Sequence, residues 1–313
     1  MIEVHHLTRR YGATTAVDDL SFSVRPGIVT GFLGPNGAGK TTTMRMILGL
    51  ERPTSGQALV DGRPLAEHPD PSGRIGSLLE AKAVHPARSA RNHLRALAAT
   101  AGIPDRRVDE VLELVGLTGV AGRAAGDFSL GMAQRLGIAT ALLGDPDTIM
   151  LDEPVNGLDP EGIVWIRHLL RGLAAEGRTV FVSSHLMTEM ALTADRFVIV
   201  GRGRLVADVS RTELEAMSAG TAVFVRTGDG AALRSALAAD GVRITDSADV
   251  ADGFDVTGVD SDTVGRLAAS NGLTLLELTP HRGSLEETFM DLTRGSVQHH
   301  ARATHRGELV GVA

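Results

Sequence analysis

Short apolar runs alternate with helical patterns through the first two-thirds of the chain. Residues 17–24 alternate apolar and polar side chains, as is typical of a strand, and residues 27–33 resemble a buried strand. Residues 88–125 form an insert with apolar positions at helical spacing. The other strands are expected at 57–60, 74–79, 148–151, 179–182 and 196–200, and the other helices at 40–50, 131–143, from 160 onward and at 187–194. Strands that alternate with helices predict an α/β fold with a mainly parallel sheet.

The pattern changes after residue 210. A strand, a helix, two strands, a helix and a strand are expected at 221–226, 231–239, 242–245, 254–259, 262–270 and 273–278. This is the ferredoxin-like order of a small α+β domain. We therefore expect a first domain at 1–215, with a helical subdomain at about 86–144, and an accessory domain at 220–295. A last helix is expected at 284–293, and residues 296–313 are expected to form a flexible tail.

The composition agrees with two domains and excludes several kinds of chemistry. With 313 residues and 43% hydrophobic side chains, the chain can fill two cores. It has no cysteine, which excludes disulfides, thiolate metal sites and cysteine nucleophiles. No apolar run approaches the roughly 18 residues of a membrane span, and the N-terminus lacks signal-peptide character, so we expect a soluble, cytoplasmic chain. The net charge of -7 disfavours nucleic-acid binding.

A glycine-rich segment joins the strand at 27–33 to the helix at 40–50, and it matches the pattern G-x-x-x-x-G-K-[ST]. Its glycines let successive backbone N–H groups face one concavity and bind polyphosphate. Lys40 should reach the phosphates, and Thr41 should supply a ligand to Mg²⁺. A chance glycine-rich turn is the alternative, which the flanking strand and helix disfavour. The expected ATP-binding residues here are Gly34, Pro35, Asn36, Gly37, Ala38, Gly39, Lys40, Thr41 and Thr42.

An apolar strand at 148–151 ends in two carboxylates, Asp152 and Glu153. The carboxyl ends of parallel strands are where such sheets hold ligands. Asp152 is therefore a candidate Mg²⁺ ligand, and Glu153 a candidate general base for an attacking water. Alone, a strand that ends in Asp-Glu is also a common surface pattern.

Residues 128–135, which end seventeen residues before Asp152, resemble the signature motif of ATP-binding cassette (ABC) transporter ATPases. A serine hydroxyl and glycine amides at the start of a helix form an anion site. The resemblance implies that Ser129 and Gly131 bind ATP in trans, in the partner subunit of a head-to-tail dimer. The usual motif has two adjacent glycines, whereas Leu130 and Met132 flank Gly131 here. A serine-capped helix without this role is the alternative.

Further segments resemble the family in the order that it requires. Tyr11 lies where the family stacks an aromatic ring on adenine, and residues 157–159 resemble the loop that links the two ATP sites, with Asp159 in the communicating position. Residues 183–185 end a strand and resemble the switch-histidine segment, which implies that His185 contacts the γ-phosphate. A lone histidine is otherwise more often structural than catalytic.

Glu80 follows the strand at 74–79, where the family usually carries a glutamine that binds Mg²⁺. A carboxylate is a harder oxygen ligand but adds negative charge beside Asp152 and Glu153. The glutamate and the residues after it resemble the bacitracin-type and antibiotic-export branch of the family. Our hypothesis is that Glu80 is a metal ligand.

The resemblance implies the ATPase subunit of an ABC exporter, with ATP and Mg²⁺ as cofactors and with drug-, antibiotic- or lipid-like compounds as substrates. Two copies would dock on the inner face of the membrane through a separate permease, whose coupling helix the insert would receive. The insert's apolar positions fit internal packing equally well. In related exporters an accessory domain is thought to support dimerisation or regulation, although its Asp-rich faces here fit a solvated surface.

Two other functions use the same phosphate loop. A soluble ABC ATPase that acts on DNA or ribosomes is the first, but this chain has neither a long heptad insert nor a second cassette. A small-molecule kinase is the second, and it leaves the segment at 128–135 and His185 unexplained.

Overall fold

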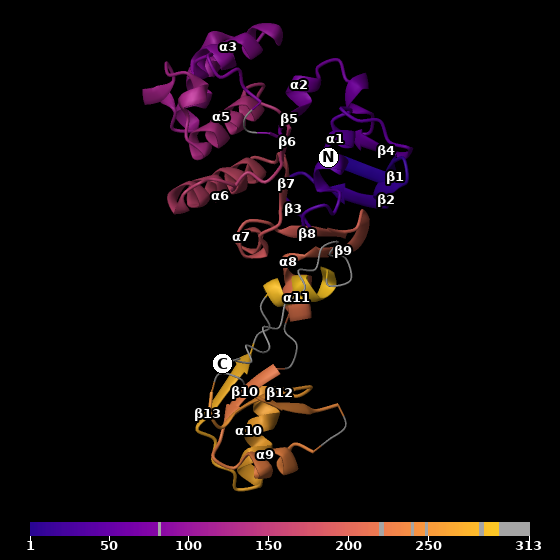
Figure 1. Ribbon diagram of the computed structural model, residues 1–313, viewed down its shortest axis with the longest axis vertical. Coiled ribbons are helices and arrows are strands. Elements are labelled where there is room, and N and C mark those ends of the chain that lie inside the picture. The colour runs from indigo at the N-terminus through magenta and orange to yellow at the C-terminus, as the bar shows by residue number, and fades with distance from the viewer. Residues whose placement is uncertain (81–82, 219–221, 239–240, 248–249, 282–284, 294–313) are drawn as a thin grey trace, which may run out of the picture.

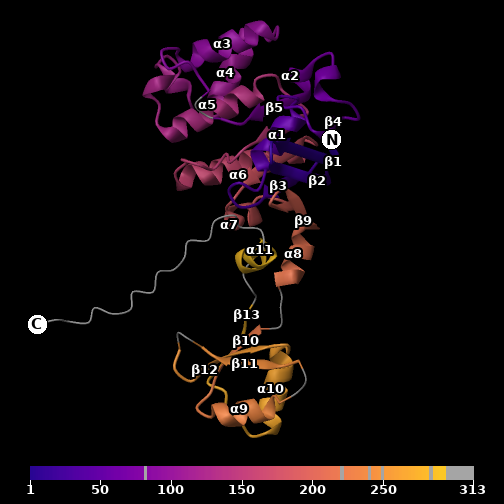
Figure 2. The same ribbon diagram turned by 45° about the vertical axis from the view of Figure 1, so that its right-hand side comes forward.

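The computed structural model describes residues 1–80, 83–218, 222–238, 241–247, 250–281 and 285–293. The predicted tail at 296–313 lies outside these residues. Among the described residues, the strands form three sheets. Two sheets build the N-terminal domain, and the third belongs to the accessory domain, which lies beyond α8 and α11 in both views (Figures 1 and 2).

A six-stranded sheet runs through the centre of the N-terminal domain (Figure 1). Its neighbouring strands are parallel except for the last pair, which forms an antiparallel hairpin. In sheet order the strands are β5 (Ile75–Leu78), β6 (Thr148–Leu151), β7 (Thr179–Ser184), β3 (Val29–Leu33), β8 (Arg196–Gly201) and β9 (Arg204–Ser210). The mainly parallel sheet confirms the predicted fold class. Strand β9 was not predicted, and it follows a tight turn in which Arg202 and Gly203 have φ angles of 48° and 79°.

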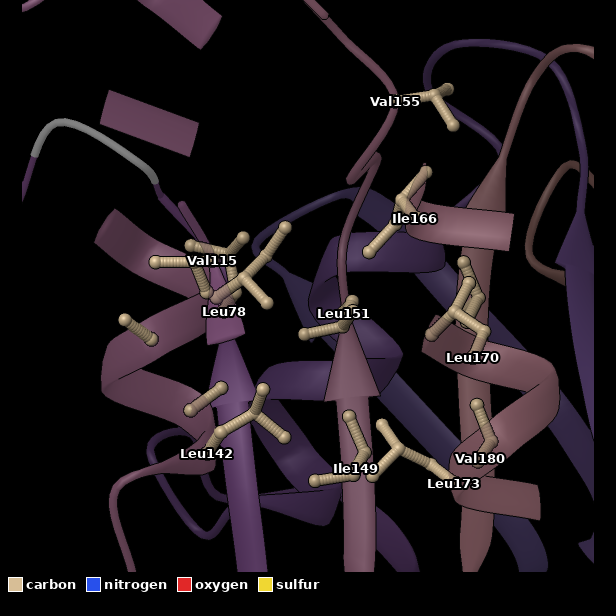
Figure 3. Packing of buried hydrophobic residues seen from close by; sticks show 14 of the residues in the cluster. Leu78, Val115, Leu142, Ile149, Leu151, Val155, Ile166, Leu170, Leu173 and Val180 are labelled. Atoms are coloured by element: carbon tan, nitrogen blue, oxygen red, sulfur yellow. The ribbon is translucent and has the colours of Figure 1, made fainter. Parts of the chain in front are cut away.

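Both faces of this sheet are covered, which explains why its strands are apolar runs in the sequence. Successive residues of each inner strand enter two different cores. In β7, Val180 and Val182 point into the core with α5 and α6, whereas Phe181 joins the core on the other face. Figure 3 shows the first core, where Leu142 of α5 and Leu170 of α6 pack over the sheet.

A three-stranded antiparallel sheet covers the second face, and helix α1 lies in the core between the two sheets. Rings of Phe22, Phe32 and Phe181 meet in this core, with centroids 5.1 to 5.7 Å apart. The strands are β2 (Thr14–Val24), β1 (Ile2–Tyr11) and β4 (Ser55–Val60). Strand β1 was not predicted, because its alternation breaks at His6, where φ is 49° and the register shifts.

Helices of the insert form the subdomain at the top of Figure 1, as predicted. Their apolar faces, with Leu94 of α3 and Val111 and Leu112 of α4, are fully buried. The helices of the N-terminal domain are α1 (Lys40–Ile47), α2 (Pro71–Arg74), α3 (Ala90–Thr100), α4 (Asp105–Leu114), α5 (Leu130–Leu142), α6 (Pro160–Ala175), α7 (Met187–Ala191) and α8 (Arg211–Ser218). The described residues contain no helix that is long and apolar enough to span a membrane.

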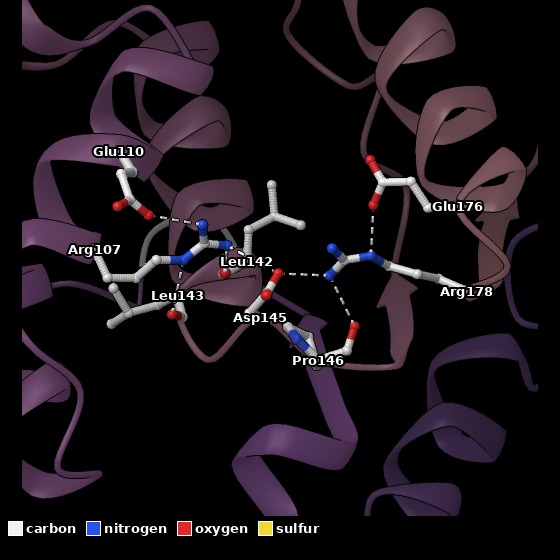
Figure 4. A network of polar contacts seen from close by, with 8 residues as sticks. All are labelled: Arg107, Glu110, Leu142, Leu143, Asp145, Pro146, Glu176 and Arg178. Carbon is white, nitrogen blue, oxygen red and sulfur yellow. Dashed lines mark hydrogen bonds and ion pairs between the residues drawn. The ribbon is translucent and has the colours of Figure 1, made fainter.

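Polar contacts join this subdomain to the sheet at the amino ends of its strands (Figure 4). Arg107 of α4 donates to the carbonyl oxygen of Leu142, at the end of α5, at 2.9 Å and to Asp145 Oδ1 at 3.2 Å. Arg178, just before β7, donates to the same Asp145 oxygen at 2.8 Å. Asp145 therefore links helix α4 to the start of β7.

The accessory domain has the predicted ferredoxin-like topology. Its antiparallel sheet has the order β11-β12-β10-β13, and helices α9 and α10 share its apolar core with Val225, Leu233 and Val264. Its elements are β10 (Ala222–Arg226), α9 (Gly230–Ala236), β11 (Arg243–Asp246), β12 (Gly253–Thr257), α10 (Ser261–Ser270) and β13 (Glu277–His281). The last strand was predicted at 273–278, but pairing with β10 starts only at Glu277.

The last helix, α11 (Leu285–Thr293), packs against the N-terminal domain. Sequence reasoning grouped it with the accessory domain at 220–295. In the structure, Phe289 is only 5% exposed and joins the core that contains Leu214 of α8 and Met190 of α7. An amphipathic pattern predicts a helix but does not specify the core that it covers. Along the sequence, the accessory domain is therefore inserted between α8 and α11, which both pack on the N-terminal domain.

Candidate functional site

Three segments meet at the carboxyl ends of the adjacent strands β6, β7 and β3. The glycine-rich loop follows β3, Asp152 and Glu153 follow β6, and His185 follows β7. A cleft of about 230 Å³ lies between the glycine-rich loop and Glu153. Its lining consists of Ala16, Asn36, Gly37, Ala38, Gly39, Lys40, Thr41, Thr42 and Glu153.

The glycine-rich loop has no room for a side chain at Gly34 or Gly39. A Cβ atom on Gly39, which has a φ of 97°, would lie 2.5 Å from the carbonyl oxygen of Ala16. A Cβ atom on Gly34 would lie 2.5 Å from the carbonyl oxygen of Val200. The loop ends at Gly39, and α1 begins at Lys40 with no side chain capping its N-terminus. The first N–H groups of this helix, together with its dipole, thus suit a phosphate.

Lys40 is buried in the cleft, with a residue exposure of 7%. Its Nζ donates to the carbonyl oxygen of Gly34 at 2.6 Å and lies 3.4 Å from Glu153 Oε1. The ammonium is therefore held between its own loop and a carboxylate, where a phosphate can replace the carbonyl partner.

Asp152 accepts hydrogen bonds on both carboxylate oxygens. The hydroxyl of Thr41 donates to Oδ2 at 2.6 Å, and the hydroxyl of Ser183 donates to Oδ1. Thr41 and Asp152 thus present a hydroxyl and a carboxylate at one point, which are oxygen donors that suit Mg²⁺. No group of three or more His, Asp or Glu residues that could hold a metal is present among the described residues.

Glu153 adopts an uncommon backbone conformation for a non-glycine residue, with a φ of 50°. Its N–H donates to Ser183 Oγ at 2.9 Å, and its carbonyl oxygen accepts from Gln134 Nε2 at 3.3 Å. The backbone of Glu153 is thereby fixed from β7 and from α5. Such strained conformations persist where the surrounding structure determines them.

The carboxylate of Glu153 lies between two basic groups. Oε1 faces Lys40, and Oε2 lies 2.8 Å from Nδ1 of His185. With a side-chain exposure of 20%, the carboxylate is reachable by water. The structure therefore brings Lys40, Glu153 and His185 together, although Lys40 and His185 are 145 positions apart in the chain (185 − 40).

The segment that resembles the signature motif lies outside this cleft. Ser129 caps α5 by accepting the N–H of Met132 at 3.2 Å, and a Cβ atom on Gly131 would lie 2.9 Å from the carbonyl oxygen of Gly157. Asp159 caps α6 by accepting the N–H of Gly162 at 2.9 Å. The described lining of the cleft includes none of Ser129, Gly131 and Asp159. The roles that the resemblance implies for them in a partner subunit stay predictions.

Tyr11 and Glu80 also lie outside the lining of the cleft, as do Gly34, Pro35, Asp152 and His185. Tyr11 is 44% exposed, and its ring centroid is 4.6 Å from the Arg9 guanidinium carbon. The Tyr11 hydroxyl donates to Glu51, and this bond, together with Arg9, holds the pKa of the Glu51 carboxyl below its ordinary value. Glu80 is exposed, two residues after the end of β5. The roles predicted for Tyr11 and Glu80 stay predictions.

Sequence reasoning gave no role to Ser183 or Gln134, although both lay in segments that it singled out. Each binds the backbone of Glu153 and is buried, with residue exposures of 0% and 5%. A serine at the end of an otherwise apolar strand was the available signal for Ser183. Gln134 lies on a helix, and nothing in the sequence around it indicated that its side chain would bind the backbone of Glu153.

Comparisons with known proteins agree with this geometry. The model of the ABC transporter family matches residues 17–156, and a domain family of unknown function matches residues 221–286. The bacitracin transport ATP-binding protein BcrA of Bacillus licheniformis is 44% identical over 212 residues, which is 67% of this chain and 69% of BcrA. The lantibiotic transport ATP-binding protein SrtF of Streptococcus pyogenes is 34% identical over 208 residues, 66% of this chain and 90% of SrtF.

A solved structure of an ATP-binding subunit of an ABC transporter superposes on the chain with a TM-score of 0.63. It is 29% identical, and the match covers 69% of this chain and 92% of that one.

Proposed function

Because this chain belongs to the family of ATP-binding proteins of ABC transporters, and is thus an ATPase, we propose that it powers an exporter for antibiotic-like compounds. The names of the bacitracin and lantibiotic transport relatives support this substrate class. We place its catalytic centre at Glu153, with Lys40 and His185 as the residues that flank it. The contact of all three side chains at the carboxyl edge of the sheet is the observation that carries the proposal.

ATP would lie with its phosphates over the glycine-rich loop. The N–H groups of the loop and of α1 would bind them, from Gly34 to Thr42, and the Lys40 ammonium would leave its carbonyl partner for the β- and γ-phosphates. Tyr11 is proposed to contact the adenine. Bound Mg²⁺, held by Thr41, Asp152 and, in our hypothesis, Glu80, would neutralise charge that develops on the phosphates.

Hydrolysis would then follow from the position of Glu153. A water attacks the γ-phosphorus in line, the bond from this phosphorus to the bridging oxygen of ADP breaks, and the Glu153 carboxylate takes the proton from the water. His185 orients this carboxylate and contacts the γ-phosphate, while Lys40 stabilises the negative charge. The products are ADP and phosphate.

A second copy would complete each site. Ser129 and Gly131 stand at the N-terminus of α5 outside their own cleft, so we propose that they bind the γ-phosphate of the partner subunit's ATP. Asp159 lies two residues after Gly157, whose carbonyl oxygen leaves no room for a Cβ atom on Gly131, and we propose that it passes the state of one site to the other. The dimer would dock on the inner face of the cell membrane through a separate permease.

Replacing Glu153 by glutamine tests the catalytic assignment. We expect the Glu153→Gln variant to bind ATP normally and to lose about 10²- to 10⁴-fold in turnover, the usual contribution of a general base. Glu161→Gln, at an exposed position of α6, is the matched control and should keep full activity. ATP binding and phosphate release are the measurements, and near-normal hydrolysis by Glu153→Gln refutes the assignment.

The proposed partner is tested separately. A tagged chain should co-purify from detergent-solubilised membranes with a membrane protein encoded beside it. Recovery of the chain only from the soluble fraction contradicts the transport role and leaves the ATPase assignment intact.

A further inference from the structure

Ser183 lies between the two residues that follow β6 and is completely buried. Its hydroxyl donates to Asp152 Oδ1, and its oxygen accepts the N–H of Glu153 at 2.9 Å. A serine hydroxyl has one proton to donate and lone pairs to accept with, so the single group serves both contacts at once.

The two contacts constrain the site in different ways. The bond to Oδ1 fixes the rotation of the Asp152 carboxylate and leaves Oδ2 facing Thr41 at 2.6 Å. The bond to the Glu153 N–H holds the backbone at a φ of 50°, from which the Glu153 side chain reaches Lys40 and His185. Hydrogen bonds to the Ser183 hydroxyl on β7 thus help to fix the orientation of both side chains.

The surroundings of Ser183 explain why this hydroxyl matters. The three residues before it, Val180, Phe181 and Val182, are fully buried and apolar. Water is therefore kept from this side of the site. Without the hydroxyl, the Glu153 N–H and one oxygen of Asp152 lose a partner, and unsatisfied buried polar groups are costly.

We propose that Ser183 is a positioning residue, which sets the Asp152 carboxylate for Mg²⁺ and the Glu153 backbone for proton transfer. This inference rests on the proposed roles of Asp152 and Glu153. Ser183 acts through these two residues and contacts neither ATP nor the attacking water. Partners of metal ligands typically contribute about 10- to 100-fold to metal affinity or activity.

The test uses the full chain with Ser183→Ala, Ser183→Thr and a control, Thr30→Val. Thr30 is also completely buried in the sheet, and its hydroxyl has no hydrogen-bond partner among the described residues. Thermal unfolding of each variant reports its folding. ATP affinity is measured in the hydrolysis-deficient Glu153→Gln background, once with Mg²⁺ and once with EDTA, and steady-state hydrolysis is measured against Mg²⁺ concentration.

Ser183→Ala should weaken binding of ATP with Mg²⁺ by about 10-fold and leave binding in EDTA unchanged. It should raise the Mg²⁺ concentration for half-maximal hydrolysis and lower kcat, and Ser183→Thr should restore both because it keeps the hydroxyl. Equal losses with and without Mg²⁺, or an unchanged Mg²⁺ midpoint, overturn the inference. Near-normal ATP hydrolysis by the Glu153→Gln variant would instead overturn the proposed function. The Mg²⁺ concentration for half-maximal hydrolysis by the Ser183 variants would still test the role of Ser183.

Discussion

Replacing Phe289 by alanine tests which domain helix α11 stabilises. The Phe289 side chain is 5% exposed and lies in the core of the N-terminal domain. Burial of such a side chain contributes about 1.5 to 3 kcal/mol, and the cavity left by truncation brings the usual cost of Phe→Ala to about 3 to 5 kcal/mol. At about 2 to 4 °C per kcal/mol for a domain of this size, we expect Tm to fall by roughly 10 °C.

Thermal unfolding with and without ATP and Mg²⁺ identifies the domain that is affected. Ligand binding raises the Tm of the domain that holds the site, so ATP marks the transition of the N-terminal domain. Phe289→Ala should lower this transition, whereas Val264→Ala, in the accessory core, should lower the other. Met290→Ala, at a neighbouring position that is 56% exposed, is the control and should change stability by less than about 0.5 kcal/mol. The assignment of α11 fails if Phe289→Ala leaves the ATP-sensitive transition where it was.

Two more predictions concern pH and metal dependence. Burial, followed by repulsion from Arg88, lowers the pKa of His93 below its ordinary value, so the unfolded chain binds the proton first as the pH falls below about 6.5. As the pH falls below about 6.5, the free energy of unfolding should therefore decrease by up to about 1.4 kcal/mol per pH unit. In urea titrations at several pH values, His93→Asn should show a smaller decrease than the unmodified chain. The same pH dependence in both proteins contradicts the burial argument. Glu80→Ala should raise the Mg²⁺ concentration needed for hydrolysis more than Glu80→Gln, which keeps an oxygen donor, and unchanged behaviour in both variants sinks the hypothesis that Glu80 is a ligand.

The sequence predicted those features that a local pattern encodes. The loop from Gly34 to Thr41 needs glycines and a lysine at fixed spacing, and the carboxylates after β6 need only an apolar strand before them. A pattern along the chain therefore sufficed to predict that Lys40 and Glu153 lie close together, and the structure has them 3.4 Å apart.

Local patterns of this kind cannot predict contacts between segments that are far apart in the sequence. Ser183 matters because β7 lies beside β6, which places its hydroxyl against residues about thirty positions earlier in the chain. Strand β1 was missed because a bulge interrupts its alternation at His6. Helix α11 was placed in the wrong unit because amphipathicity says that one face is buried and leaves its partner open.

Helix α5 packs along the edge strand β5 and its neighbour β6 and has polar contacts at both of its ends. In its last turn, the carbonyl oxygen of Leu142 accepts a hydrogen bond from Arg107, and at its start Ser129 caps the turn that contains Gly131. Its 13 residues make an arm of about 20 Å. One helix thus joins the contact with Arg107 at the amino ends of the strands to the proposed phosphate contact of Ser129 at the other end.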